Sequence, residues 1–141
     1  MPSGSGTLRA AVDLPPVARS AAAARHVVGQ VLAAWAAESF CEDATLLVSE
    51  LVTNVVRHVA GPLTMRLEVA LTDSGPSDGG RTERGLRVAV VDRSPAPPVV
   101  GARGPAGGYG LGLVVAIADR WGSEEHRGGK RVWFELGHRA G

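Results

Sequence analysis

Apolar residues recur along the chain at two different spacings, and each spacing predicts its own kind of element. Steps of three and four residues predict a first helix from about Val17 to Ala37, after Pro15-Pro16, and a second from roughly Asp43 to Val59. Gly61-Pro62 is expected to stop the second helix. A third apolar run, residues 109–120, is also compatible with a helix.

Alternation of apolar and polar residues predicts the strands. The segment 63–72 has this period, whereas 85–92 is apolar on both faces near its end, so we expect it to be central in a sheet. A short strand is expected over 7–14, and two more are expected on either side of Gly128-Gly129, a hairpin signal. The predicted order is strand, helix, helix, strand, strand, helix, strand, strand.

Consecutive strands joined by short loops predict an α+β fold, a two-layer α/β sandwich. We expect a mixed, mostly antiparallel sheet with three helices on one face. The domain is expected to span residues 15–137, between an N-terminal tail with its short strand (1–14) and a C-terminal tail (138–141).

Composition narrows the class of protein. The chain has 141 residues, 45% of them apolar, which suits one domain with a substantial core. A net charge of +1 marks neither a nucleic-acid binder nor a membrane-surface binder. Cys41 stands alone, so no internal disulfide or cysteine zinc cluster is expected. The first residues contain no long apolar run; we therefore expect neither signal peptide nor membrane anchor, and a cytoplasmic protein.

The second predicted helix carries an unusual polar arc. In the stretch SELVTNVVRH, Glu50, Asn54 and His58 follow one another at steps of four. On a helical wheel Asn54 lies only ~60° from Leu51, a member of the apolar stripe. The polar side chains are therefore expected to border the core. That stripe consists of Ala44, Val48, Leu51, Val52, Val55 and Val59.

Two interpretations of this arc stay open at the level of the helix alone. A helical Glu is most often solvated, a mid-helix Asn often makes a structural hydrogen bond, and His58 and Arg57 suit the C-terminal dipole. Alternatively, the Asn54 carbonyl oxygen is a suitable Mg²⁺ ligand, and Glu50 one turn earlier can polarise an attacking hydroxyl or water. Phosphoryl transfer requires both parts beside a polyphosphate.

Two further segments supply candidate parts of a nucleotide site. Asp92 follows a predicted central strand, where its carboxylate either caps a turn or accepts a hydrogen bond from an exocyclic amine such as adenine N6. The segment GGYGLGL leads into the third apolar run, and closely spaced glycines let backbone N–H groups approach phosphates, although they also suit a hinge. A Walker phosphate loop is excluded, because Lys130 is followed by Arg131 rather than Ser or Thr.

Four segments in this order, LLVSELVTNVVRH, VVDRSPAPP, GGYGLGLVVAIADRWG and GKRVWFEL, resemble the Bergerat ATP-binding domain of the GHKL superfamily. Within it they are similar to the small stand-alone anti-sigma-factor serine kinases. The resemblance covers about residues 15–136. It implies that Glu50 is the catalytic base, that Asn54 binds Mg²⁺, and that Asp92 pairs with the adenine amine of ATP.

The resemblance also implies an ATP lid over residues 93–108 and a second glycine box around the phosphates. The glycines of this box, with the two residues whose backbone N–H groups are implied to bind the anion, are Gly108, Gly110, Leu111, Gly112 and Leu113.

The implied function is regulatory. Such a protein transfers the ATP γ-phosphoryl group to a serine of an anti-anti-sigma (STAS-type) partner, or sequesters a sigma factor, or does both. The resemblance implies no direct contact with nucleic acid or membrane, and it is compatible with a homodimer.

The alternative is a non-catalytic protein-binding module in which nucleotide binding is weak or only structural. Two departures motivate it: Ser94 and Ala96 replace glycines after Asp92, and Arg131 replaces a threonine beside the adenine. The bulk of Arg131 is expected to close or remodel that wall of the pocket.

Overall fold

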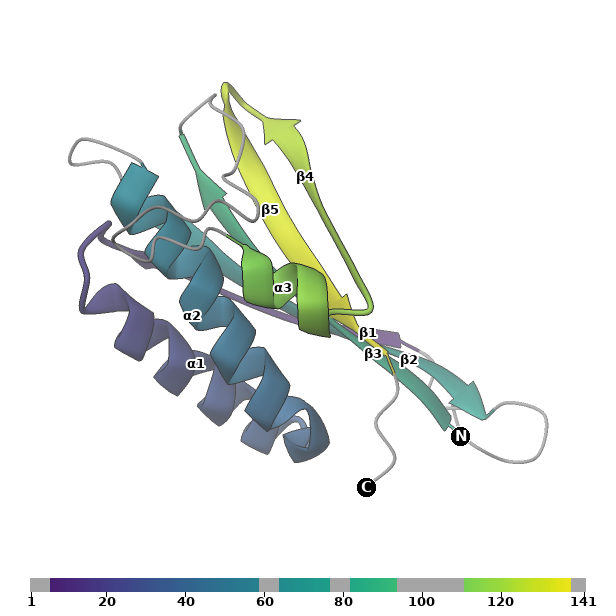
Figure 1. The fold of residues 1–141 in the computed structure, drawn as a ribbon. Helices are drawn as coiled ribbons and strands as arrows, with labels where there is room; N and C mark the ends of the chain where they lie inside the picture. The colour runs from purple at the N-terminus through teal and green to yellow at the C-terminus, as the bar shows by residue number, and fades with distance from the viewer. Residues whose placement is uncertain (1–5, 59–63, 77–81, 94–110, 138–141) are drawn as a thin grey trace.

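A computed structural model describes residues 6–58, 64–76, 82–93 and 111–137 (Figure 1). The strands are β1 (Gly6–Leu14), β2 (Met65–Pro76), β3 (Thr82–Asp92), β4 (Arg120–His126) and β5 (Gly129–Leu136). The helices are α1 (Ser20–Ala34), α2 (Cys41–His58) and α3 (Gly112–Ile117), with a short 3₁₀ turn, η1 (Glu38–Phe40), before α2. The predicted order of elements is confirmed.

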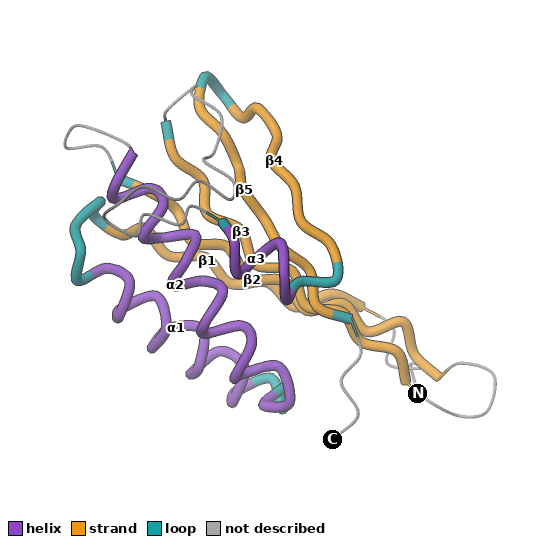
Figure 2. Tube along the Cα trace, viewed as in Figure 1, coloured by secondary structure: helices purple, strands orange, loops and turns teal. Residues whose placement is uncertain are grey.

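The sheet has the strand order β1-β2-β3-β5-β4, and every neighbouring pair in the described residues is antiparallel. β3 is central, as expected from its apolar sequence. The three helices cover one face of the sheet (Figures 1 and 2). The fold class is therefore the predicted α+β sandwich, with an antiparallel rather than a mixed sheet. β1, which lies before the predicted start of the domain, pairs with β2 from Gly6 to Leu14. The predicted domain limits of 15–137 stay a prediction.

The first helix is shorter than the predicted Val17–Ala37. At its start, the Ser20 hydroxyl donates a hydrogen bond of 2.6 Å to the Pro15 carbonyl. At its end, the backbone leaves the helix at Ala36, whose φ is 53°. The Arg84 guanidinium, which comes from β3, donates to the Trp35 and Ala36 carbonyls at 3.1 and 3.0 Å. A contact distant in the sequence thus satisfies carbonyls that the helix leaves without partners.

The third helix also stops before the predicted limit of residue 120. Ala118 is already extended, with ψ at 146°, and the Asp119 amide donates to the Glu135 carbonyl at 3.0 Å. Arg120 and the following Trp121 belong to β4 and pair with β5. Sheet pairing therefore overrides the helical periodicity at this end of the run.

The β4–β5 turn lies one residue earlier than the predicted Gly128-Gly129. Arg127 and Gly128 occupy the turn, with φ of 50° and 82°, while His126 pairs with Gly129. Positive φ at both central residues is typical of a two-residue hairpin turn. Gly129 is needed for space instead, because a Cβ there would overlap the Asp92 carbonyl oxygen and lie 2.6 Å from the Arg93 Cα.

The core lies between α2 and the inner face of the sheet. α2 packs against α1, α3, β3 and β5, and its predicted stripe is buried from Ala44 to Val55, while Val59 lies outside the described residues. Alternate residues of the central strands complete the core. They are Leu67, Val69 and Leu71 of β2, Leu86, Val88 and Val90 of β3, and Val132, Phe134 and Leu136 of β5.

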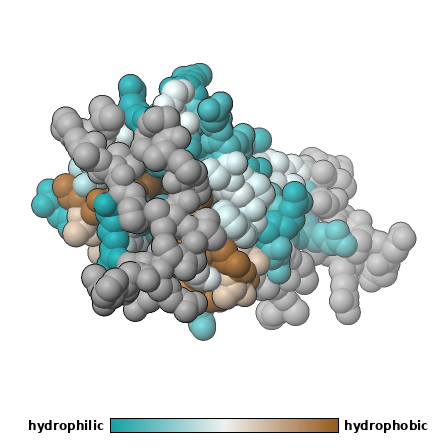
Figure 3. Space-filling model, turned by 45° about the horizontal axis from the view of Figure 1, so that its top comes forward, coloured by the Kyte–Doolittle hydropathy of each residue, from teal (hydrophilic) through white to brown (hydrophobic). Residues whose placement is uncertain are grey.

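The coloured surface in Figure 3 is mostly hydrophilic or weakly polar, with apolar residues in a few small patches. Four large hydrophobic side chains of the described residues are exposed: Leu8, Leu46, Leu113 and Val115. None of the helices in the described ranges has the length and hydrophobicity needed to cross a bilayer.

We predict that Gly129→Ala lowers the free energy of unfolding by about 1–3 kcal/mol, because the added methyl group forces β5 away from the end of β3. Gly29→Ala in α1 is the matched control. No atom lies within 4 Å of its added Cβ, and alanine is expected to stabilise the helix by about 0.5–1 kcal/mol. Urea unfolding of both variants tests this; equal stability of Gly129→Ala and wild type would contradict it.

Candidate functional site

The polar arc of α2 includes a side chain that is buried in the protein interior. Asn54 is only 4% exposed, deeper than the expected border position. Glu50, one turn earlier, is half-buried, and Arg57 is exposed. The polar side chains of this helix therefore range from the buried Asn54 to the solvent-exposed guanidinium of Arg57.

The side-chain oxygen of Asn54 has no hydrogen-bond partner in the described part of the protein. This Oδ1 atom is buried. An unsatisfied buried acceptor costs about 1–3 kcal/mol of folding free energy. A neutral carboxamide oxygen in this state is suited to receive a hydrogen-bond donor or a hard cation from a ligand.

The fit of Mg²⁺ depends on this oxygen. The described residues contain no cluster of three or more His, Cys, Asp or Glu side chains that could cage a metal. Mg²⁺ usually keeps several waters and is bound by one or two protein oxygens together with substrate phosphates. Asn54 matches that kind of site, in which most of the other ligands come with the nucleotide.

The carboxyl group of Glu50 is half-buried, and its pKa is shifted. Burial raises the pKa of its carboxyl above the ordinary value, and the positive charge of Arg57 opposes part of that rise. A raised pKa makes the carboxylate a stronger base near neutral pH. The environment of Glu50 thus suits the role implied by the sequence resemblance, although that role stays a prediction.

Asp92 is buried, and its neighbour is a residue that sequence reasoning missed. It faces Lys130 across β3 and β5, and the two side chains are 1% and 7% exposed. The Lys130 Nζ lies 3.1 Å from each carboxylate oxygen of Asp92. The predicted adenine acceptor is therefore part of a buried ion pair.

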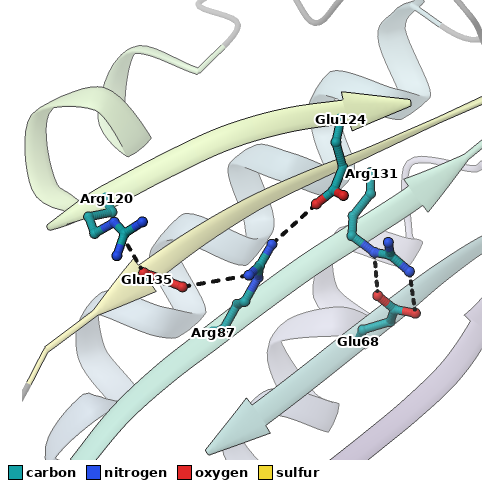
Figure 4. Close-up of polar contacts among 6 residues, drawn as sticks. All are labelled: Glu68, Arg87, Arg120, Glu124, Arg131 and Glu135. Atoms are coloured by element: carbon teal, nitrogen blue, oxygen red, sulfur yellow. Dashed lines mark hydrogen bonds and ion pairs between the residues drawn. The ribbon is translucent and has the colours of Figure 1, made fainter. Parts of the chain in front are cut away.

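The expectation that Arg131 remodels the adenine wall is wrong. Arg131 points to the other face of the sheet, where its Nε and Nη2 donate to Glu68 at 2.9 and 3.4 Å (Figure 4). Strand alternation explains this, because Arg131 shares a face with Trp133 and Glu135, whereas Lys130 shares the buried face with Val132.

The glycine segment is only partly described. Gly108 and Gly110 lie outside the described residues, as does all of the expected lid except Arg93. Leu111 is fully buried directly before α3, Gly112 is the first residue of α3, and Leu113 is 40% exposed. The roles predicted for these residues stay predictions.

The elements that carry the candidate residues pack together. α2, with Glu50 and Asn54, lies against β3, which ends in Asp92, and against α3. Segments about forty positions apart in the sequence are thus packed together, with α2 on the inner face of β3 (Figure 2). The candidate nucleotide site is the part of this arrangement that carries polar groups: Glu50 and Asn54 on α2, Asp92 at the end of β3, and the start of α3.

The open face of the sheet has a different character. A hollow of about 660 Å³ lies there, with alanine at its base and charged side chains from all five strands around it. Arg87 bridges Glu124 at 3.3 Å and Glu135 at 3.7 Å (Figure 4). Its guanidinium lies 4.2 Å from the Trp133 ring centroid. Because it lies on the face of the sheet opposite to the buried Asp92–Lys130 pair, this hollow is not part of the candidate site.

We predict that Glu50→Gln raises the melting temperature at pH 7–8. The carboxyl's pKa is higher in the folded than in the unfolded state, so ionisation of Glu50 opposes folding above pH 4.5. The gain should shrink as the pH falls to 4.5 and below, because the wild-type carboxyl is then protonated. Glu83→Gln, at an exposed position, is the control. A gain that does not change with pH would show that burial of the carboxylate charge is not its cause.

Comparison with known proteins agrees with this architecture. The family described as the histidine kinase-like ATPase domain matches residues 14–136. The fold is similar to the crystal structure of the RsbU and RsbW domains of Rv1364c from Mycobacterium tuberculosis, with a TM-score of 0.62 and 21% sequence identity. That match covers 94% of this chain and 34% of the other. No curated protein matches significantly. Since the family match covers most of its length, the chain belongs to the histidine kinase-like ATPase domain family.

Proposed function

We propose that this chain is an ATP-binding regulatory protein of the anti-sigma-factor type. It transfers the γ-phosphoryl group of ATP to a serine of a STAS-type anti-anti-sigma partner, sequesters a sigma factor, or does both. Membership of the ATPase family supports nucleotide binding. The observation that carries the proposal is the buried Asn54 Oδ1 without a partner in the described residues, one helical turn from Glu50.

Asn54 is the proposed protein ligand of Mg²⁺. When bound, the ion neutralises charge on the β- and γ-phosphates. Gly108, Gly110 and Gly112, with the backbone N–H groups of Leu111 and Leu113, are proposed to surround the phosphates. Asp92 is proposed to accept a hydrogen bond from the adenine amine.

Glu50 is the proposed base. It orients the partner's serine hydroxyl and accepts its proton as the serine oxygen bonds to the γ-phosphorus. The bond from that phosphorus to the β,γ-bridging oxygen breaks, and ADP leaves. Burial of Glu50 supports this role, since it raises the pKa of the carboxyl.

One observation favours the alternative, a protein-binding module with weak nucleotide affinity. Lys130 already contacts both oxygens of Asp92, so an adenine amine must share that carboxylate. Sharing reduces the affinity unless Lys130 itself contributes to base binding. Measured affinities for Mg-ATP and for a sigma factor distinguish the two functions.

We predict that Asn54→Ala weakens Mg-ATP binding by about 10–100-fold in isothermal titration, the loss of one charge-assisted contact. Without Mg²⁺, wild type and variant should bind ATP equally. Because Asn54 Oδ1 makes no hydrogen bond within the described protein, the variant should keep its stability. Thr53→Ala, at the preceding half-buried position, is the control. Unchanged Mg-ATP binding by Asn54→Ala would show that the metal assignment is wrong.

We predict that Glu50→Gln slows phosphoryl transfer from labelled ATP to a STAS-type partner by about 100-fold or more, while ATP binding is retained. In wild type the rate should fall as the pH drops through the pKa of Glu50, which lies above 4.5. Glu42→Gln, at an exposed position of the same helix, should leave the rate unchanged.

Two results separate the candidate functions. Undiminished transfer by Glu50→Gln excludes Glu50 as the base. Absence of transfer by the wild-type protein, together with tight binding of a sigma factor, supports the binding module.

A further inference from the structure

We propose that Lys130 is a base-recognition residue, whose ammonium group donates a hydrogen bond to adenine N1 while the neighbouring Asp92 accepts one from the N6 amine. The inference rests on the proposed ATP-binding function and identifies a specificity residue that the sequence resemblance does not imply.

The ammonium group of Lys130 retains a donor for a ligand. Its side chain is 7% exposed, and its Nζ lies 3.1 Å from both oxygens of Asp92. An ammonium group has three N–H donors, and the carboxylate engages at most two of them at these positions. No other interaction of Nζ is found in the described part of the chain. The remaining buried N–H favours an additional acceptor, because an unsatisfied donor costs free energy.

A purely structural role explains the ion pair poorly. The buried positions of the same two strands are otherwise apolar: Leu86, Val88 and Val90 in β3, and Val132, Phe134 and Leu136 in β5. Replacing a buried ion pair by apolar residues is often neutral or stabilising. The only lysine of the chain therefore stands where a valine or leucine would serve the core equally well.

The two charged groups match one edge of adenine. Adenine presents a donor at N6 and an acceptor at N1, side by side; a carboxylate and an ammonium group in contact present the complementary acceptor and donor. Guanine in the same pose would turn its N1–H donor toward the Lys130 ammonium. Because a buried donor facing a donor leaves both unpaired, the pair should discriminate against GTP.

The test compares ATP with 1-deaza-ATP, in which a C–H group replaces N1 and the N6 amine is kept. We predict that wild type binds 1-deaza-ATP about tenfold or more weakly than ATP in isothermal titration. Lys130→Met should bind the two nucleotides equally. Arg131→Met removes the adjacent cation, which points to the opposite face and pairs with Glu68, and should keep the wild-type ratio.

The outcomes separate this inference from the proposed function. Equal binding of ATP and 1-deaza-ATP by wild type overturns the role of Lys130 and leaves ATP binding intact. The same conclusion follows if Lys130→Met prefers ATP over 1-deaza-ATP as strongly as wild type does. No binding of ATP by wild type overturns both. If Lys130→Met fails to fold, wild type and Arg131→Met still test the inference. Wild type must prefer ATP over 1-deaza-ATP, and Arg131→Met must show the same preference.

Discussion

The packing of α2 on the centre of the sheet is the constraint on which the candidate site depends. One side of this helix is apolar and buried, and it contacts β3 and β5 as well as α1 and α3. Rotation of the helix to expose Asn54 would also expose Leu51 and Val55, at a cost of about 1.5–3 kcal/mol for each side chain. The burial of Asn54 is therefore enforced by its apolar neighbours, although its Oδ1 makes no hydrogen bond with the described residues.

The sheet applies a second constraint, strict alternation of faces. On β3 and β5 it places Asp92 and Lys130 inside the protein, opposite each other, and sends Arg131 to the outer face. The outer face carries several Arg–Glu ion pairs, whereas the inner face, over the described residues, has one buried ion pair among apolar residues. The same strands thus have a charged outer face and an inner face that carries Asp92 and Lys130.

Periodicity was sufficient to predict the layers and most of the core. The α2 stripe, the central position of β3 and the order of elements follow from local spacing, which is why they were predictable. The end of α1 was not predictable from local spacing, because Arg84, 48 residues beyond Ala36, donates hydrogen bonds to the carbonyls at that end. The end of α3 was not either, since pairing of β4 with β5 competes with helix there.

Lys130 was missed although the sequence contained a signal for it. The alternation of Val132, Phe134 and Leu136, extended one step toward the N-terminus, places residue 130 on the buried face and Arg131 outside. The same extension from Leu86, Val88 and Val90 reaches Asp92. Ser94 and Ala96 lie outside the described residues, so their effect on adenine binding stays a prediction.

ATP binding beside Asn54 of α2 and Asp92 at the end of β3 is what most needs a direct test. The most direct measurement is a crystal structure with Mg²⁺ and a non-hydrolysable ATP analogue. We expect the metal on Asn54 Oδ1 and the adenine edge against Asp92 and Lys130. An analogue bound instead in the charged hollow of the open face, beside Arg9 and Arg87, would contradict this expectation.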